Sequence, residues 1–132
     1  MYLLDTNICI YLMKNRFPGL TAKFMRTLPS EMCVSSVTVY ELEYGAAKSG
    51  WGERTRDNLR LFLAGFDVVP FDTPDAVCAG RIRAELEKNG TPIGVYDLQI
   101  AAQGVARGFT VVTRNTGEFS RVPGLSIEDW CS

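Results

Sequence analysis

Residues 1–14 read MYLLDTNICIYLMK, a short apolar run followed at once by an acid and by residues that favour a helix start. Tyr2–Leu4 predicts a buried β-strand. Thr6 and Asn7 are both good N-cap residues for a helix that runs to about Lys14. The chain therefore opens with a strand that leads directly into a helix, and Asp5 stands at the junction.

The same alternation of short strands and longer helices continues to the end of the chain. Further strands are expected at residues 32–35, 68–71, 109–113 and 126–130, and helices at 20–28, 38–48, 53–63, 74–89 and 96–107. Four to five short strands separated by helices predict an α/β fold with a central parallel sheet covered on both faces. A length of 132 residues fits a single domain, 1–132.

The composition limits the chemistry, because the chain has no histidine. Ser-His-Asp and Cys-His nucleophiles are excluded, as are zinc sites with histidine ligands. Catalysis must then use carboxylates, Lys, Tyr, Cys or a metal held by oxygen. The net charge of −1 neither indicates nor excludes a nucleic-acid partner, because a local basic stripe can lie on a neutral whole.

The four cysteines are expected to be buried free thiols in a reducing cytoplasm. They are Cys9, Cys33, Cys78 and Cys131, and no two have a CxxC spacing. No uncharged run is long enough for a transmembrane helix, so no membrane association is expected.

Three carboxylates stand where a parallel sheet would gather functional groups. Asp5 follows the first strand, Glu41 shares a helix face with Val37 and Tyr44, and Asp97 begins a helix after a Pro/Gly loop. Each has an ordinary structural explanation: a helix N-cap for Asp5, a structural hydrogen bond or ion pair for Glu41, and helix-dipole complementarity for Asp97.

Asn115 and Glu118 follow the strand at 109–113 and extend this set. The alternative for them is an Asx-type turn and an exposed acid. Carboxylates brought together repel one another unless a cation lies among them. Hard oxygen ligands without histidine or paired cysteines favour Mg²⁺, with Mn²⁺ as a substitute.

At these residues the sequence resembles the PIN-domain ribonucleases, and specifically the VapC toxins of VapBC toxin–antitoxin pairs. The resemblance covers essentially the whole chain and is carried by four motifs in the family order, LLDTNICIYLMK, SSVTVYELEYGAAKS, NGTPIGVYDLQIAA and VVTRNTGEFSRVPGLSIEDW. It implies a PIN-like three-layer fold. It also implies a cytoplasmic Mg²⁺-dependent endoribonuclease that cuts structured RNA such as tRNA or rRNA loops.

The resemblance assigns roles to individual residues. Asp5 and Asp97 match the family's principal metal ligands, and Glu41 matches the acid that holds a metal or its water. The usual fourth acid is replaced by Asn115, with Glu118 as the nearest carboxylate. All five are expected in the catalytic site, with one tightly held metal and a second recruited by substrate.

The resemblance also implies a homodimer that is neutralised by a VapB-type antitoxin covering the active site. Contacts with RNA are expected from Arg114, Thr6 and Asn7. Further basic candidates are Arg54, Arg56, Arg60, Arg81, Arg83 and Arg121. Tyr40, Tyr44, Phe62 and Phe66 are expected in the core or at the dimer interface.

The competing interpretations lack the residues they need. A haloacid-dehalogenase phosphatase requires a second Asp at the position of Asn7, and a response-regulator receiver requires an acidic pair near its first strand. A PIN-like scaffold that binds RNA or a partner without catalysis is the remaining alternative. Cleavage assays with and without Mg²⁺ would separate it from the enzyme.

Overall fold

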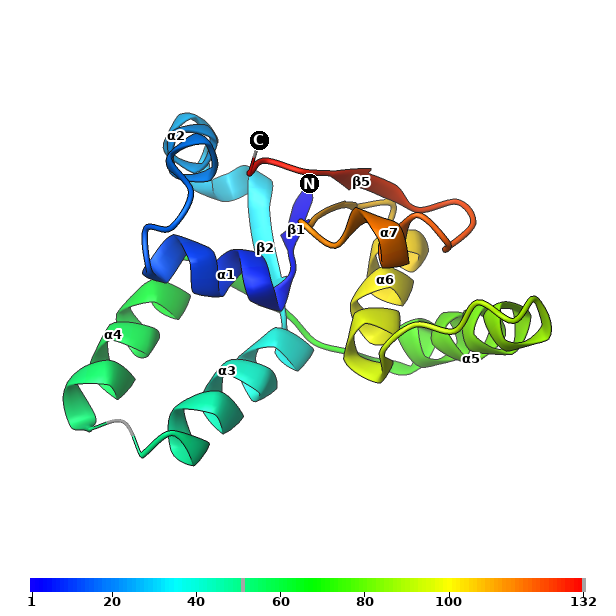
Figure 1. Ribbon diagram of the computed structural model, residues 1–132, viewed down its shortest axis with the longest axis horizontal. Helices are drawn as coiled ribbons and strands as arrows, with labels where there is room; N and C mark the ends of the chain where they lie inside the picture. Colours follow the sequence, from blue (N-terminus) through cyan, green and yellow to red (C-terminus); the bar gives the residue numbers. More distant parts are fainter. Residues whose placement is uncertain (51, 132) are drawn as a thin grey trace.

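The computed structural model describes residues 1–50 and 52–131, which fold around a five-stranded parallel sheet (Figure 1). The strand order is β3-β2-β1-β4-β5, and every neighbouring pair is parallel. The strands are β1 (Tyr2–Leu4), β2 (Met32–Ser35), β3 (Asp67–Val69), β4 (Thr110–Val112) and β5 (Ser126–Glu128). The expected α/β fold with a covered parallel sheet is confirmed.

Helices connect the strands in the order expected for parallel crossovers. They are α1 (Thr6–Met13), α2 (Pro18–Arg26), α3 (Ser36–Lys48), α4 (Glu53–Ala64), α5 (Thr73–Lys88), α6 (Val95–Arg107) and α7 (Thr116–Phe119), with a 3₁₀ turn at Pro29–Glu31. In Figure 1, α1, α2 and α4 lie to one side of the sheet, and α5 and α6 lie to the other.

Alternate side chains of the strands pack into two separate cores, one on each face of the sheet. The sheet and the helices on its two faces therefore form three layers. Leu3 and Val111 pack into the core beneath α5 and α6. Leu4 and Val112 pack into the core beneath α1, α2 and α4. All four side chains are fully buried, as the two-residue repeat of a strand covered on both faces requires.

The site is positioned by the point where the strand order reverses. Connections from β1 run outward through β2 to β3, and the chain then returns to place β4 on the other side of β1. The carboxyl ends of β1 and β4 are therefore neighbours at a topological switch point, the usual location of binding sites in open α/β sheets. The Asp5 N–H donates to the carbonyl of Val112 at 3.1 Å and continues this pairing.

Several boundaries differ from the sequence prediction for local reasons. The third strand is Asp67–Val69 and not 68–71, because Pro70 has no N–H and the Phe71 N–H donates to the Ser36 hydroxyl at 3.0 Å. Helices α2 and α3 begin two residues earlier than predicted. The short helix α7 was not predicted.

The expectation for the cysteines holds in part. All four are free, with Cys9 and Cys33 buried, but Cys78 and Cys131 are half-buried. Both lie at the margins of the two cores. Among the described helices, none is long and apolar enough to cross a membrane.

Candidate active site

Asp5 is a buried carboxylate at the end of β1. Its side chain is 3% exposed, and its Oδ1 accepts the N–H of Ile8 at 2.9 Å, which caps α1. Burial raises the pKa of Asp5 to about 6, and the charge of Glu41 raises it further. Hydrogen bonds from the Thr113 side chain and from Ile8 act in the opposite direction. The N-cap explanation is therefore correct, and the same carboxylate also faces other site residues.

Glu41 is tied to the segment after β1 through Thr6. The Thr6 hydroxyl donates to Glu41 Oε1 at 2.7 Å and also contacts the Thr38 hydroxyl at 3.1 Å. Thr38 is fully buried and Thr6 nearly so, whereas Glu41 is partly exposed. These contacts fix the start of α1 against α3 and point the Glu41 carboxylate toward the end of β1.

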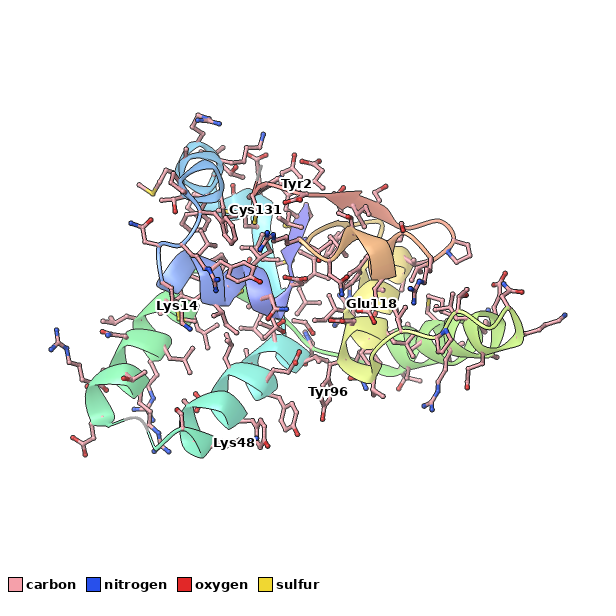
Figure 2. The ribbon with its side chains drawn as sticks, viewed as in Figure 1. Tyr2, Lys14, Lys48, Tyr96, Glu118 and Cys131 are labelled. Carbon is pink, nitrogen blue, oxygen red and sulfur yellow. The ribbon has the colours of Figure 1, made fainter. Side chains whose placement is uncertain are left out.

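Asp97 and Glu118 shift each other's pKa in opposite directions. Burial raises the pKa of Asp97 to about 7, and the hydrogen bond and charge of Glu118 add to this effect, followed by the charges of Asp5 and Glu41. The hydrogen bond with Asp97 lowers the pKa of Glu118. These directions favour protonation of Asp97 over Glu118, and the charges of Glu118, Asp5 and Glu41 all act on Asp97. Figure 2 shows Glu118 on α7, facing α6.

Asn115 positions Glu118. It caps α7 by accepting the Glu118 N–H at 3.4 Å, and its Nδ2 donates to Glu118 Oε2. The backbone N–H of Gly94 donates to the other carboxylate oxygen at 3.1 Å. The side chain of Asn115 therefore serves as a helix N-cap, since its bond reaches the third residue on and not the second as in an Asx turn. The fourth carboxylate at this edge is thus supplied by Glu118, three residues after Asn115.

Among residues 1–50 and 52–131, no cationic side chain forms an ion pair with this cluster, although the charge of Arg121 helps to lower the pKa of Glu118. The ion pairs within the described ranges join Arg83 to Glu87 and Arg107 to Asp72 and Asp75, all elsewhere. Nor do three acidic or cysteine side chains form a preassembled metal-binding group among residues 1–50 and 52–131. The site is a loose cluster of oxygen donors with excess negative charge.

The predicted substrate contacts lie in different surroundings. Asn7 is exposed on the first turn of α1, whereas Thr6 is buried against Glu41. Arg114 is exposed, and its guanidinium carbon lies 4.6 Å from the centroid of the Phe17 ring. Arg83 is paired with Glu87 on α5. The assignment of these residues to RNA binding stays a prediction.

Sequence analysis missed three groups that shape the site. They are the hydroxyls of Thr38 and Thr113 and the backbone N–H of Gly94. Thr113 could have been noticed, because it directly follows β4 and is the counterpart of Asp5 after β1. The contacts of Thr38 and Gly94 depend on packing between segments far apart in the chain and leave no local signal.

Beside the acidic cluster, the surface carries a groove and a group of exposed tyrosines. The groove has a volume of about 430 Å³ and lies between α1, α3 and α4, with Glu41 in its wall. Tyr40, Tyr44 and Tyr96 are roughly half exposed, so of the two positions expected for Tyr40 and Tyr44 the core is excluded and the dimer interface stays a prediction. Phe62 and Phe66 do pack against the core beneath α4.

Comparison with known proteins identifies the family. The sequence profile of the PIN domain matches residues 2–125. The chain is 45% identical to the tRNA(fMet)-specific endonuclease VapC of Salmonella typhimurium over 130 residues, which cover 98% of both chains. It is 41% identical to ribonuclease VapC2 of Haemophilus influenzae, over 98% of this chain and 97% of that one.

Solved structures agree with the sequence comparison. The chain superposes on DNA-bound VapBC from Salmonella typhimurium with a TM-score of 0.92 and 45% identity, over 98% of both chains. Against VapBC2 from Rickettsia felis, bound to a promoter fragment, the TM-score is 0.90 at 34% identity, again over 98% of both chains. The α/β fold, with carboxylates gathered at the switch point of its sheet, defines the class of protein as a PIN-domain nuclease. The chain belongs to this family and, within it, to the VapC ribonuclease toxins of VapBC toxin–antitoxin systems.

Proposed function

We propose that this chain is a Mg²⁺-dependent endoribonuclease whose site is formed by Asp5, Glu41, Asp97 and Glu118, with Asn115 orienting Glu118. The observation that carries the proposal is the convergence of four carboxylates near the carboxyl ends of β1 and β4, none of which forms an ion pair within the described chain. The raised pKa values of Asp5 and Asp97 mean that this arrangement of carboxylates lowers the stability of the fold at neutral pH. A sheet edge with no function beyond folding would have no reason to keep such an arrangement.

The donor set fits Mg²⁺. All the donors are hard oxygens, and Mg²⁺ is usually bound by one or two carboxylates while it keeps several waters and contacts substrate phosphates. Such a site needs no preassembled group of three acids. Asp5 and Asp97 would hold the ion, and Mn²⁺ could substitute for it. When bound, the ion would neutralise phosphate charge and make water a stronger nucleophile.

The chain's own residues would divide the remaining work. Glu41, held by Thr6 at 2.7 Å, is placed to orient the attacking water and accept its proton. Glu118 and Asn115 would keep Asp97 in position across the pair. Because no histidine is present, the 2′-hydroxyl route of metal-free ribonucleases lacks its usual acid–base pair. We propose that water attacks the phosphorus while the bond to the 3′-oxygen breaks, which leaves 5′-phosphate and 3′-hydroxyl ends.

We propose a structured RNA, and tRNA in particular, as the substrate. The support is the identity of 45% and 44% to two proteins named tRNA(fMet)-specific endonucleases, from Salmonella typhimurium and Shigella flexneri. An initiator tRNA is thus the first candidate. Such an activity belongs in the cytoplasm, where free cysteines are stable.

We propose that a VapB-type antitoxin covers the groove between α1, α3 and α4. The groove wall combines apolar side chains with Glu41, so a segment lying in it would reach the acidic cluster. Its apolar wall suits one face of an amphipathic helix. The relatives from Salmonella, Rickettsia and Haemophilus were crystallised as VapBC complexes, which supports the choice of partner.

We also propose a homodimer that uses the exposed tyrosines of α3 and α6. Tyr96 donates to the Tyr40 hydroxyl at 3.2 Å, and Tyr40 stacks with Tyr44, so an apolar surface with polar tips is preformed. Figure 2 places Tyr96 at the start of α6, beside α3. Sedimentation of the purified protein as a dimer would support this arrangement, and a monomer at all concentrations would contradict it.

The test of the nuclease uses two neighbouring glutamates of α3. Glu41→Gln should reduce Mg²⁺-dependent cleavage of purified tRNA by about 100-fold or more, because the proton acceptor is lost. Glu43→Gln, two residues away on the same helix, should leave the rate within about twofold. Equal rates for both variants would refute the role of Glu41. Cleavage that persists with a chelator would refute the metal.

A further inference from the structure

We propose that Arg16 and Arg114 form a pair of phosphate-binding cations, held on the rings of Phe17 and Tyr11, that grips the RNA backbone beside the acidic cluster. The proposal rests on the ribonuclease function proposed above and adds a substrate-binding surface to it. We call these two side chains the arginine pair.

Aromatic rings, rather than carboxylates, hold the arginine pair. The Arg114 guanidinium carbon lies 4.6 Å from the Phe17 centroid, and that of Arg16 lies 6.0 Å from the same centroid and 5.8 Å from that of Tyr11. The two rings meet edge to face with centroids 5.0 Å apart. Both cations are therefore placed around one rigid aromatic unit and keep their positive charge.

A tight turn after α1 places Arg16. Asn15 has a positive φ of 49°, and the N–H groups of Asn15 and Arg16 donate to the carbonyls of Leu12 and Tyr11 at 3.1 and 3.0 Å. This is a Schellman motif with asparagine in the left-handed position. The Thr21 hydroxyl donates to Asn15 Oδ1 at 2.9 Å and further fixes the turn. Arg16 and Phe17 are thus folded back over Tyr11.

The arginine pair keeps its hydrogen-bond donors available. Along the two described stretches, neither guanidinium makes a hydrogen bond or an ion pair. By contrast, Arg107 donates to Asp75 and Asp72, and Arg121 donates to the Pro92 carbonyl. A guanidinium that contacts a ring through its face leaves its N–H edge free for a phosphate.

Arg114 connects the arginine pair to the acidic cluster. Its neighbour Thr113 follows β4 as Asp5 follows β1 and lowers the pKa of Asp5, and its other neighbour Asn115 donates to Glu118 Oε2. A strand of RNA whose phosphate reached Asp5 and Asp97 would therefore pass Arg114 next. The chain places two free cations at the border of a site that otherwise repels polyanions, which is the charge arrangement that a phosphodiester chain requires.

The test measures binding of unfractionated tRNA in chelator, so that no cleavage occurs, for wild type, Arg16→Gln, Arg114→Gln and the double variant. Each lost phosphate contact should lower the slope of log Kd against log salt by about 0.7, and the double variant by about 1.4. The ratio of the double variant's Kd to the wild-type Kd should then fall by about sevenfold between about 50 and about 200 mM salt.

Two further variants sharpen the result. Lys88→Gln removes a cation in the last turn of α5, far from α1 in Figure 1, and should leave Kd and the salt slope unchanged. Phe17→Leu removes the ring but keeps both charges, so affinity should fall while the slope is retained.

Unchanged Kd and slope in the double variant would overturn the proposal. If wild type still cleaves tRNA in Mg²⁺ in that case, the nuclease stands and the arginine pair has another anionic partner, such as an acidic protein segment. If wild type does not cleave, the proposed function has failed, and the two failures remain distinguishable.

Discussion

Asp5 serves both the fold and the site, and these two roles conflict. As the N-cap of α1 it accepts the Ile8 N–H, which stabilises the helix. As a buried carboxylate its pKa is raised to about 6, mainly by burial. A carboxyl group whose pKa is higher in the folded than in the unfolded chain binds more protons when folded. The metal-free protein therefore loses stability as the pH rises from about 4 to about 6, and the loss persists above that range.

We accordingly expect Asp5→Asn to stabilise the metal-free protein at neutral pH. Asparagine retains the cap oxygen and removes the buried charge, so the free energy of unfolding should rise by ~1–3 kcal/mol at pH 8 and little at pH 4. Urea unfolding at both pH values measures this. If Asp5→Asn is less stable than wild type at pH 8, the charge of the Asp5 carboxylate must be stabilised by other groups in the folded protein.

The Asp97–Glu118 pair predicts a pH profile. Asp97 must be ionised to hold a cation, and its pKa is raised to about 7, with Glu118 contributing after burial. Removing that negative charge with Glu118→Gln should lower the pKa of Asp97, so the acidic limb of cleavage should move toward lower pH by roughly half a unit to one unit. The measurement is the normalised rate of tRNA cleavage from pH 5 to pH 9. An unmoved limb would mean that Glu118 does not influence Asp97 in the working enzyme.

At the scale of elements, α6 carries Asp97 at its first turn and approaches β4 very closely near its last. A Cβ atom added at Gly104 would lie 2.7 Å from Leu125 Cδ1 and 2.8 Å from Val111 Cγ2. Such distances force neighbours to move. The glycine therefore sets how closely α6 packs on the sheet and hence where Asp97 stands.

Gly104→Ala should destabilise the protein by ~1–3 kcal/mol because of overpacking. The matched change is Gly80→Ala on α5, where an added Cβ meets nothing within 4 Å. Better helix propensity should there stabilise the protein by ~0.5–1 kcal/mol. Thermal unfolding compares the two variants. Similar melting temperatures for both would show that α6 can move away from β4.

Much of the element layout could be predicted from sequence, because it depends on local patterns. Runs such as FTVVT mark strands, and Gly108 marks the end of α6, where it adopts a φ of 68°. The four-residue helix α7 was missed because it has no room for a helical period. The cluster in which Arg107 contacts the buried Asp75 at 3.0 Å was also missed, because it joins helices distant in the chain.

The candidate site could be predicted in part from local patterns, and the prediction stayed incomplete where a residue's role depends on contacts between distant segments. Asp5 and Asn115 each follow a strand, so a parallel sheet must bring them to one edge. The function of Asn115 as the residue that orients Glu118 depends on α7, and the position of Arg16 depends on a turn whose only local sign is Asn15. Exposure of Tyr40 depends on which helix faces are covered, which periodicity alone does not reveal.

At the scale of the whole molecule, the groove between α1, α3 and α4 predicts how the protein is neutralised. Gly45 lies in its wall, and an added Cβ there meets nothing within 4 Å. Gly45→Phe should fill the groove without disturbing the core. Antitoxin affinity should fall by about tenfold or more while cleavage is retained.

The measurement is binding of the cognate VapB-type antitoxin to purified Gly45→Phe, with Gly80→Phe on the distant helix α5 as the control. Unchanged antitoxin affinity in Gly45→Phe would place the antitoxin elsewhere on the surface.

The chemistry of the cleaved RNA ends tests most directly whether the acidic edge of the sheet is a metal-dependent nuclease site. Purified protein is incubated with tRNA and Mg²⁺ beside Asp97→Asn, and the new ends are analysed. Wild type should produce 5′-phosphate and 3′-hydroxyl ends, and Asp97→Asn should lose about 100-fold or more of the rate. Cyclic 2′,3′-phosphate ends, or undiminished cleavage by Asp97→Asn, would contradict the account.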